Sequence, residues 1–592
     1  MVGAQIRKFA PGFERVGREA LARDLVAAMT VTALAVPQGM AYALIAGVPP
    51  EMGLWAATIP ALLGALFGSS PHLVTGPTNA ISLVIGVSVV APVVAAGGVP
   101  PIETVLAIGV LAGAILAAFG LIGLGGASRF MSDSVVGGFA AGAGLLIALR
   151  QVPSISGLDP VPGGVDSLVP NVWPLIRAAV HAVTTADARS LGLALAVPLG
   201  ALAARRLDPR IPGALLALVG ATGVAHICGW LEGPAALATI GSIPARLPEL
   251  ALPLAQDPVA LVPTAFAVAM LAITQSIASA RAVASGAGDS AHKRFDPDRE
   301  LFAQGLANLG AAFVGALPGS GSLTRSALAR SAGGRSRLTA AASGLMMLAV
   351  VPAVAPLLGG TPLAALAGLV VLSGLDLIDL RALRRAAVTR GDAVVLATTI
   401  GTMLWIDLVQ AIYAGLLLSL LLLVRRSGRL QLVEIVRAGP RVFREIPVDR
   451  KTGSTQAVML HLEGDLNFAV AGTLADRLLE IAGRGAEVVI LRLKRARHLD
   501  ATVLEALRRV VAHLDERGVK VLICGLTEPI ARLLERSELG PMLGPEGLLR
   551  AGPRLSEGFE RALQSARDRL RPRAGAEIFR GDEVDAPEFD EI

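Results

Sequence analysis

Charged residues are scarce in this chain of 592 residues, and they are unevenly spread. Asp, Glu, Lys and Arg make up 17% of the sequence, against roughly 25% in a typical soluble protein. The last 168 residues hold 54 of the 100 charged residues, so charge is about 11% before Arg425 and about 32% from there on. This division argues against one water-soluble enzyme and predicts a membrane domain, residues 21–426, followed by a soluble part.

Cysteine is almost absent as well. Cys228 and Cys524 lie in different regions, so neither a disulfide framework nor a cysteine-based metal site is available, and we expect no metal and no cofactor. The net charge of +6 suggests nucleic acid, but the basic residues lie in short clusters between apolar segments, as in cytosolic loops of membrane proteins. Residues 1–20 lack the apolar core and cleavage site of a signal peptide, which predicts a cytosolic N-terminal helix.

Long apolar stretches fill the first part of the chain. About 20 apolar residues cross a bilayer as a helix, and the longest uncharged runs, Met52–Ile102 and Leu338–Leu375, divide at Gly68–Pro71 and Gly359–Pro362. About 14 membrane segments result, and the first division yields one full helix and one shorter helix. Loops after even-numbered segments hold most of the arginines, which predicts an inner-membrane protein with both termini in the cytosol.

The charged C-terminal part alternates between strand and helix patterns, which predicts a small sheet covered by helices. The expected strands are Ala457–Leu462, Val488–Leu493 and Val519–Cys524, and the expected helices are Gly472–Ala482, Ala501–Arg517 and Thr527–Arg536. We predict a linker at 427–440, a folded domain at 441–571 and an acidic, disordered tail at 572–592.

Two helix breaks, Thr75–Ser82 and Pro318–Ser326, fall in the third and tenth segments. An unsatisfied backbone group is costly in lipid, so a broken helix persists where it lines a cavity or a site. Matched breaks in two halves are typical of inverted-repeat transporters with a site at the midplane. The glycines allow a tight turn, and Pro77 is expected in the first turn of the helix that follows. Two facing helix N-termini together offset about one negative charge, which predicts a site for a small anion.

Polar side chains near these breaks are the candidate ligands. The predicted anion-binding residues are Gln38, Tyr42, Thr78, Asn79, Ser320, Gly321, Ser322, Thr324 and Arg325. Arg325 is a cation at membrane depth and must be paired or functional. In the alternative interpretation, each break is a kink whose hydroxyls bond to the local backbone. Gln275 either faces the same cavity or bridges two helices.

Several motifs in fixed order resemble the SulP family of anion transporters, to which prestin and pendrin belong. They are Pro37–Ala43, Val48–Trp55, Phe67–His72, Thr75–Pro77, Glu300–Asn308 and Leu317–Ser322. The soluble part is similar to the STAS domain that follows such membrane domains. Together the similar regions cover nearly the whole chain.

This resemblance implies a multi-pass α-helical fold of 7+7 inverted repeats, UraA-like, with core and gate subdomains and a small α/β STAS domain. It also implies dimerisation, an elevator-type movement, and sulfate, bicarbonate, chloride or dicarboxylates as substrates. By motif position, Gln38, Tyr42, Thr78, Ser322 and Arg325 fall where the family lines its anion site.

Two positions carry further expectations from the resemblance. Gln275 stands where many ion-coupled members have a carboxylate, and a neutral amide at this coupling position favours exchange or uniport over symport. Thr502 lies in the loop where related STAS domains carry a phosphorylatable hydroxyl, at a helix start that favours a phosphate. Alternatively, Asp500 or Thr502 is simply the N-cap of that helix.

The sequence thus predicts a secondary anion transporter rather than an enzyme, and it carries no Walker motif for ATP-driven transport. An anion channel or voltage-responsive membrane protein of the same fold is one alternative, and a membrane-tethered STAS regulator is another. The expected partners are a small anion, the lipid bilayer, a second copy of the chain, and a cytosolic protein at the STAS domain. Nucleic acid is not expected.

Overall fold

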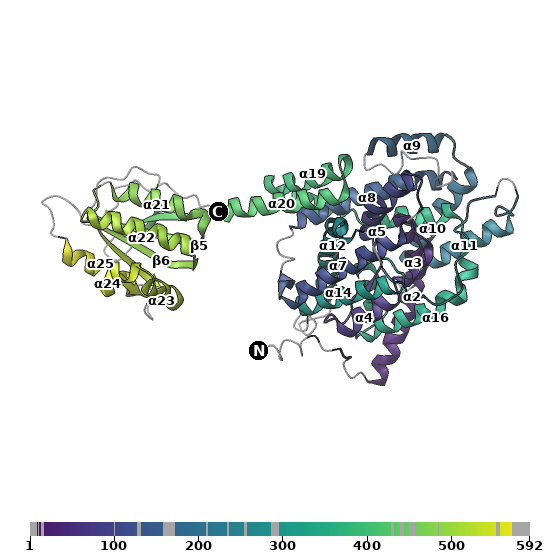
Figure 1. Ribbon diagram of the computed structural model, residues 1–592, viewed down its shortest axis with the longest axis horizontal. Helices are drawn as coiled ribbons and strands as arrows, with labels where there is room; N and C mark the ends of the chain where they lie inside the picture. Colours follow the sequence, from purple (N-terminus) through teal and green to yellow (C-terminus); the bar gives the residue numbers. More distant parts are fainter. Residues whose placement is uncertain are drawn as a thin grey trace. The chain divides into compact units, whose positions relative to one another are not determined.

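The computed structural model divides the chain into a helical unit, residues 1–419, and an α/β unit, residues 420–592, which are described separately (Figure 1). It describes the chain apart from residues 1–8, 10, 14–16, 100, 127–131, 158–171, 209–210, 234–235, 254–256, 286–294, 428–430, 438–442, 449–455, 484, 552–556 and 571–592. The predicted acidic tail and most of the predicted N-terminal helix lie outside the described residues.

Within the described residues, nine helical stretches are long and apolar enough to cross a membrane. They are formed by α2 (Arg18–Ala46), α3 with α4 (Pro50–Trp55, Ile59–Phe67), α7 (Ile102–Leu121), α8 (Asp133–Ile155), α10 (Ala188–Leu207), α12 (Pro258–Ser285), α16 (Leu338–Leu358), α17 (Leu363–Leu375) with α18 (Leu380–Val388), and α20 (Leu408–Ser427). The division of the second long run at Gly359–Pro362 is confirmed, because α16 ends at Leu358 and α17 begins at Leu363.

Shorter elements complete the helical unit. They are β1 (Val74–Gly76), α5 (Asn79–Ile85), η1 (Gly86–Val90), α6 (Ala91–Ala95), α9 (Val172–Thr184), α11 (Gly213–Ile227), α14 (Pro297–Phe313), β2 (Ser320–Ser322), α15 (Leu323–Ser331) and α19 (Arg390–Trp405). The full segment expected before Gly68 is confirmed as one stretch long and apolar enough to cross a membrane, Pro50–Phe67. It is split into α3 and α4, because Pro60 lacks a backbone N–H and starts a new helix at its first turn.

The helices of this unit pack in two groups. In the first group, α7 packs against α12 and α14, α4 against α14 and α16, and α2 against α3 and α16. In the second group, α8 packs against α17 and α19, and α10 packs against α11 and α17. Helix α2 also contacts α11 and α17, so it lies where the groups meet. This division matches the core and gate expected from the resemblance.

Close contacts inside the first group depend on glycine. A Cβ atom added to Gly53 of α3 would lie 2.0 Å from the carbonyl oxygen of Gly39 in α2. Atoms do not approach that closely, so any other residue at position 53 would force the two backbones apart. Glycines of the predicted motifs therefore set the distance between α3 and α2, and α2 is the helix that carries Gln38 and Tyr42.

The α/β unit is a six-stranded sheet in the order β4-β3-β5-β6-β7-β8. The strands are β3 (Gln431–Arg437), β4 (Phe443–Pro447), β5 (Ala457–Leu466), β6 (Val488–Leu499), β7 (Lys520–Leu526) and β8 (Leu548–Arg550). The helices are α21 (Phe468–Ala482), α22 (Ala501–Glu516), α23 (Glu528–Arg536), α24 (Leu539–Gly547) and α25 (Glu557–Arg569). From β5 to β8 neighbouring strands are parallel, while β3 runs antiparallel to both β4 and β5.

Helices cover both faces of this sheet, as predicted (Figure 1). One hydrophobic core joins α21, α22 and α23 to Val489 and Leu491, and a second joins α25 to Val488 and Ile490, the alternate residues of β6. All three predicted strands and all three predicted helices are confirmed, with ends shifted by a few residues. Strand β3 corrects the predicted linker at 427–440, because its backbone pairs with both neighbours and belongs to the sheet.

Candidate functional site

The two helix breaks meet as a two-stranded antiparallel sheet. Thr75 of β1 pairs opposite Gly321 of β2, and Gly76 pairs opposite Ser320. Each strand runs directly into a helix, β1 into α5 and β2 into α15. Two helix N-termini therefore begin next to one strand pair, which we call the crossing, residues 74–79 and 319–325.

The crossing corrects the expected position of Pro77. The sequence predicts this proline in the first helical turn, but α5 begins only at Asn79, after the extended N-cap residue Thr78. The pairing with β2 keeps the chain extended up to this point, so the helix starts later than a proline signal suggests. The extended chain leaves the Pro77 carbonyl oxygen free to accept a hydrogen bond.

The two chain segments of the crossing can approach each other this closely only because glycine lies next to glycine. A Cβ atom on Gly319 would lie 2.2 Å from the carbonyl oxygen of Gly76. A Cβ atom on Gly76 would lie 2.9 Å from Nη2 of Arg325 and 3.1 Å from the Ala56 carbonyl oxygen. The crossing is thus packed at backbone-to-backbone distance, and the predicted Gly-rich turns have a steric cause.

Helix α12 holds β2 through three polar side chains. Ser320 Oγ donates to Gln275 Oε1 at 2.6 Å. The Gly321 N–H donates to Ser276 Oγ at 2.9 Å, and Ser279 Oγ donates to the Gly321 carbonyl at 3.2 Å. Gln275 therefore touches the crossing directly, and the serines on the same helix satisfy the β2 backbone.

Helix α14 holds both strands from another side. Asn308 Nδ2 donates to the Gly319 carbonyl at 3.0 Å, and the Gly319 N–H donates to Asn308 Oδ1 at 2.9 Å. Gln304 Nε2 donates to Thr75 Oγ1 at 2.8 Å. One turn earlier, the buried Glu300 carboxylate accepts the N–H groups of Ser69 and Ser70, each at 3.0 Å.

Sequence reasoning missed the roles of these α14 residues, although they lie in the motif Glu300–Asn308. Glu300, Gln304 and Asn308 are four residues apart, so they share one helix face. That spacing was the available signal, because three polar residues on one face of an apolar helix need partners.

Arg325 lies at the centre of the crossing and is 1% exposed. Its Nη2 donates to the Pro77 carbonyl at 2.8 Å, which links α15 to the approach of α5. Its Nε and Nη1 are buried without a hydrogen-bond partner among the described residues. A buried guanidinium has five donors, so the paired one leaves capacity for an anion.

Other predicted ligands are partly occupied by the protein itself. Ser322 Oγ accepts from the Arg325 N–H at 3.4 Å and caps α15. Asn79 Oδ1 accepts from the Ala80 N–H, while its Nδ2 donates to the Ser373 carbonyl of α17 at 3.2 Å. Thr78 Oγ1 lies 3.4 Å from Ser320 Oγ. Among these side chains, Ser322 shows the bond between a hydroxyl and the local backbone that the alternative interpretation expects.

A pocket of about 430 Å³ borders the crossing. It lies between the two helix groups, with α2 and α15 on one side and α10, α11 and α17 on the other. Of the nine predicted ligands, Gln38 and Thr324 line it, and Gln38 Oε1 is buried without a hydrogen-bond partner in the described structure. Tyr42, one turn further along α2, and Arg325 are both buried, and neither lines the pocket.

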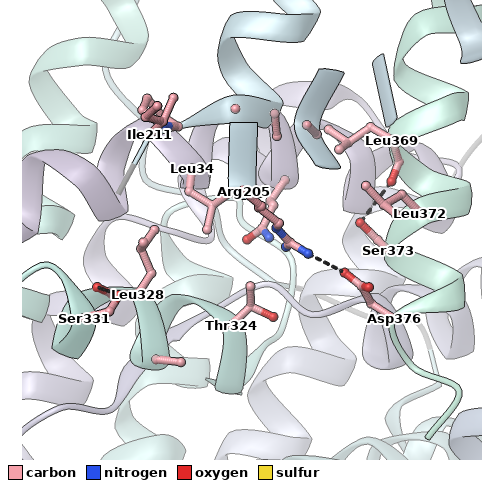
Figure 2. Close-up of a pocket in the computed structure, with 16 residues that line it drawn as sticks. Leu34, Arg205, Ile211, Thr324, Leu328, Ser331, Leu369, Leu372, Ser373 and Asp376 are labelled. Carbon is pink, nitrogen blue, oxygen red and sulfur yellow. Dashed lines mark hydrogen bonds and ion pairs between the residues drawn. The ribbon is translucent and has the colours of Figure 1, made fainter. Parts of the chain in front are cut away.

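Figure 2 shows this pocket with an ion pair in its lining, Arg205 Nη1 to Asp376 Oδ2 at 3.5 Å. Both side chains are about half exposed, at 45% and 50%. The pair neutralises two charges beside a pocket whose remaining lining is apolar or carries hydroxyl and amide groups. The pocket therefore has no net formal charge from its own lining.

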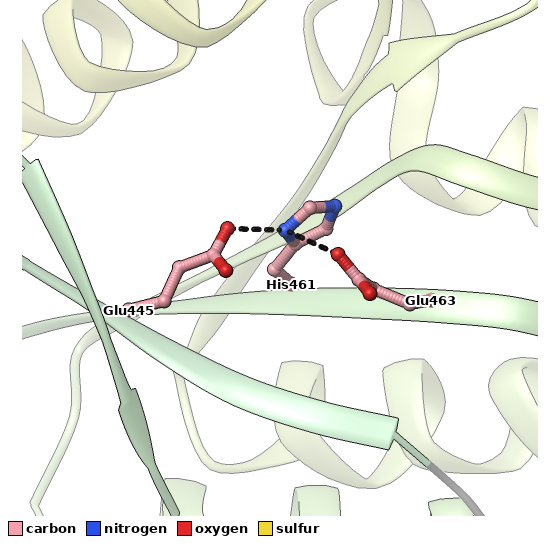
Figure 3. Close-up of side chains that lie close together, drawn as sticks. All are labelled: Glu445, His461 and Glu463. Carbon is pink, nitrogen blue, oxygen red and sulfur yellow. Dashed lines mark hydrogen bonds and ion pairs between the residues drawn. The ribbon is translucent and has the colours of Figure 1, made fainter. Parts of the chain in front are cut away.

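The α/β unit contains one cluster with metal-ligand chemistry among its described residues, Glu445, His461 and Glu463 (Figure 3). His461 Nδ1 lies 3.0 Å from Glu445 Oε1 and 3.7 Å from Glu463 Oε1. His461 also pairs in register with Arg492 of β6, so a guanidinium side chain emerges beside it on the same sheet face. That cation opposes a divalent metal, and the cluster is best described as a His–Glu network in which the imidazole is buried and Glu445 is exposed.

The predicted STAS phosphorylation site has a clear local structure. Asp500 is the N-cap of α22, and its Oδ1 accepts from the Val503 N–H at 2.9 Å. The N-cap interpretation is therefore confirmed for Asp500 and wrong for Thr502. Thr502 is the second residue of α22 and is exposed, so its hydroxyl is accessible, and its phosphorylation stays a prediction.

A helical membrane domain in which two broken helices begin side by side at a pocket is the architecture of inverted-repeat secondary transporters. Comparison with known proteins also points to a transporter family. The model of the sulfate permease family matches residues 21–399, and the STAS domain model matches residues 447–550. The chain belongs to the sulfate permease family.

Three similar proteins illustrate the range of this family. The putative sulfate transporter YvdB of Bacillus subtilis is 29% identical over 91% of this chain and 98% of its own. The bicarbonate transporter BicA of Picosynechococcus is 26% identical over 89% of this chain and 92% of its own. The structure of the murine Slc26a9 anion transporter superimposes with a TM-score of 0.79 at 18% identity, covering 94% of this chain and 92% of that one.

These comparisons confirm the family, the helical membrane fold of the UraA type and the C-terminal STAS domain expected from the motifs. The relatives are named as transporters, not as enzymes. The protein is thus a multi-pass member of an anion transporter family. The predicted number of about 14 segments and the predicted ligand residues stay predictions.

Proposed function

We propose that the protein is a secondary transporter that carries a small anion across the inner membrane and holds it between the N-termini of α5 and α15. The observation that supports this most is the crossing, where Arg325 is buried between two helix starts with two of its nitrogens unpaired among the described residues. Each helix N-terminus contributes about half a positive charge. The sum of two helix ends and one guanidinium favours an anion of charge −1 or −2.

The substrate class follows from the same groups. The crossing offers a guanidinium, hydroxyls and backbone N–H groups, which suit sulfate, bicarbonate, chloride or a dicarboxylate. Relatives named for sulfate and for bicarbonate support this range without choosing within it. Gln275 bonds to Ser320 and carries no charge, which supports exchange or uniport over cation-coupled symport.

The place of the pocket supports an elevator-type movement. One wall comes from α2 and from α15, which packs against α2 and α12 of the first group. The other wall comes from α10, α11 and α17 of the second group. If the first group slides along the second, the crossing moves with it and the anion changes sides. We extend the proposal to cytosolic termini and a homodimer, in line with the arginine distribution and the family resemblance.

The test is uptake of radiolabelled sulfate, bicarbonate, chloride and a dicarboxylate into proteoliposomes, with and without Na⁺ and a pH gradient. A carrier gives saturable counterflow for at least one anion. Large unitary currents in planar bilayers would instead support an anion channel of the same fold. No flux of any of these anions, from protein that is folded in the vesicles, would refute both.

Arg325 is tested in the same assay by Arg325→Gln. We expect its loss to reduce uptake at least about tenfold or to change the preference between monovalent and divalent anions, since a charge-assisted hydrogen bond contributes about 1.5–3 kcal/mol. The matched control is Arg330→Gln, because Arg330 lies on the same helix and donates to the Val283 carbonyl at 2.9 Å, away from the crossing. Equal behaviour of the two variants across the panel would remove Arg325 from the site.

A further inference from the structure

Helix α18 presents a basic face that has no hydrogen-bond or ion-pair partner among the residues that the structure describes. It spans Leu380–Val388 between α17 and α19 and is capped by Asp379, whose Oδ1 accepts from the N–H groups of Arg381 and Ala382 at 2.9 and 3.1 Å. None of its residues is buried, and Leu380 and Val388 are 61% and 82% exposed. The exposed side chains of this short helix are therefore accessible to a partner from outside the chain.

The two faces of α18 differ in chemistry. Ala382, Leu383 and Ala386 are half-buried, where α18 packs against α8 and α19. Arg381, Arg384 and Arg385 are exposed, and at about 100° per residue they fall within one arc of roughly 100° on the other face. One helix side is thus fixed to the helical unit, and the opposite side is cationic.

The arginines of this face are unpaired. Among the described residues, the guanidinium groups of Arg381, Arg384, Arg385 and the following Arg390 make no hydrogen bond or ion pair. This contrasts with the arginines of the α/β unit, such as Arg508 and Arg550, which bond to neighbouring glutamates. The guanidinium groups of Arg381 and Arg385 interact with the cap residue Asp379 only through space, and exposed arginines without an ion-pair partner fit an anionic partner from outside the chain.

The position of α18 indicates what kind of anionic partner binds this face. The helix follows α17, the apolar part of a stretch long enough to cross a membrane, and precedes the helix α19, so we place it at one end of the membrane-crossing region, where the bilayer meets water. Asp376, just before α18, pairs with Arg205 at the end of α10, so a third segment ends at the same level. An amphipathic helix at that level places apolar side chains such as Leu380 among acyl chains and its guanidiniums among phosphates.

We propose that α18 binds the anionic phospholipid headgroups of the bilayer leaflet at this end of the helical unit. The phosphates cover Arg381, Arg384, Arg385 and Arg390, and the exposed Leu380, at the edge of the cationic arc, enters the acyl boundary. The helix thereby ties α8, α17 and α19 to the membrane surface. This attachment is separate from anion transport and holds whether or not the protein carries sulfate or bicarbonate.

The experiment measures lipid selectivity of the full-length protein in vesicles. Spin-labelled phosphatidylglycerol and phosphatidylcholine are compared by electron paramagnetic resonance for the fraction immobilised at the protein. The wild type should prefer phosphatidylglycerol, and the preference should weaken as salt rises from low to molar concentration, because screening shortens the reach of the charges. A wild-type protein without this preference would overturn the proposal, and this arm needs no variant to fold.

In the variant R381Q/R384Q/R385Q, the preference for phosphatidylglycerol should fall at least about fivefold, which is the effect of about one arginine near an anionic surface. The charge-preserving variant R381K/R384K/R385K should retain most of it. The control R509Q/R532Q/R536Q removes the same charge from the α/β unit and should match the wild type. Equal preference in the glutamine variant of α18 and in this control would refute α18 as the binding surface.

Discussion

Asn308 is the residue whose loss should disturb the crossing most directly. Its side chain bonds to both polar groups of Gly319 and to the Gln304 carbonyl, at 2.8–3.0 Å, and it is 1% exposed. In Asn308→Ala, the Gly319 N–H and carbonyl stay buried without a partner. Each such group costs about 1–3 kcal/mol, so the crossing loses about 2–6 kcal/mol.

This loss should appear mainly in substrate binding. Gly319 directly precedes Ser320 and Gly321, so β2 loosens first and α15 loses its fixed start. If only about 1.4 kcal/mol of the loss acts on the bound state, the KM for the transported anion rises tenfold. The assay is initial-rate uptake in proteoliposomes over a range of anion concentrations, together with thermal unfolding of the same preparation.

Thr399→Val is the matched control. Thr399 is also fully buried and donates at 2.8 Å to the Val395 carbonyl, but this bond stays within α19 and away from the crossing. We expect its KM to stay within about twofold of the wild type, since a local hydrogen bond contributes about 1 kcal/mol to stability only. A KM for Asn308→Ala that equals that of this control, in a folded protein, would refute the role of Asn308 in positioning β2.

Three further predictions concern other contacts. Gly319→Ala puts a Cβ atom 2.2 Å from the carbonyl oxygen of Gly76 and should abolish the folded protein peak on size-exclusion chromatography. The control Gly137→Ala, whose Cβ atom enters open space, should keep that peak. A normal yield of folded Gly319→Ala would contradict the steric argument. Ser320→Ala and Gln275→Ala should each weaken transport, and in a double-mutant cycle they should couple by about 1 kcal/mol; additive effects would show that their 2.6 Å bond is irrelevant to the site. Asp500→Ala should lower the local stability of the first turn of α22 by about 1 kcal/mol and so speed its hydrogen exchange in the full-length protein. Unchanged exchange would exclude the cap.

The helix breaks were predictable from sequence, but their pairing was not. Gly and Pro mark each break locally, and the matched order of the two halves makes the pair meaningful. The pairing of Thr75 with Gly321 joins residues 246 positions apart through strands of three residues each. Strands this short show no alternation of apolar and polar residues, so no local signal predicts them.

The site residues were predictable by type and less so by partner. A sequence shows that Arg325 is a cation in an apolar region, but its partner, the Pro77 carbonyl, becomes available only because β1 stays extended to that point. Asn79 was predicted as a ligand, yet its amide oxygen accepts a hydrogen bond from the N–H of the next residue, Ala80. Such choices depend on distances of a few tenths of an ångström, which spacing along the chain does not contain.

The contacts of α14 limit how the protein can move. Glu300 fixes the loop before β1, Gln304 fixes β1, and Asn308 fixes the turn before β2. Three side chains on one helix face therefore join both broken helices into one body, and a movement that separates them would leave several buried polar groups unpaired. A bond that reaches the second helix group, from Asn79 Nδ2 to the Ser373 carbonyl, is only partly buried and is longer, at 3.2 Å. The weaker boundary is thus the one along the pocket, and a movement that carries the anion is expected to slide there, with the crossing and α14 travelling together.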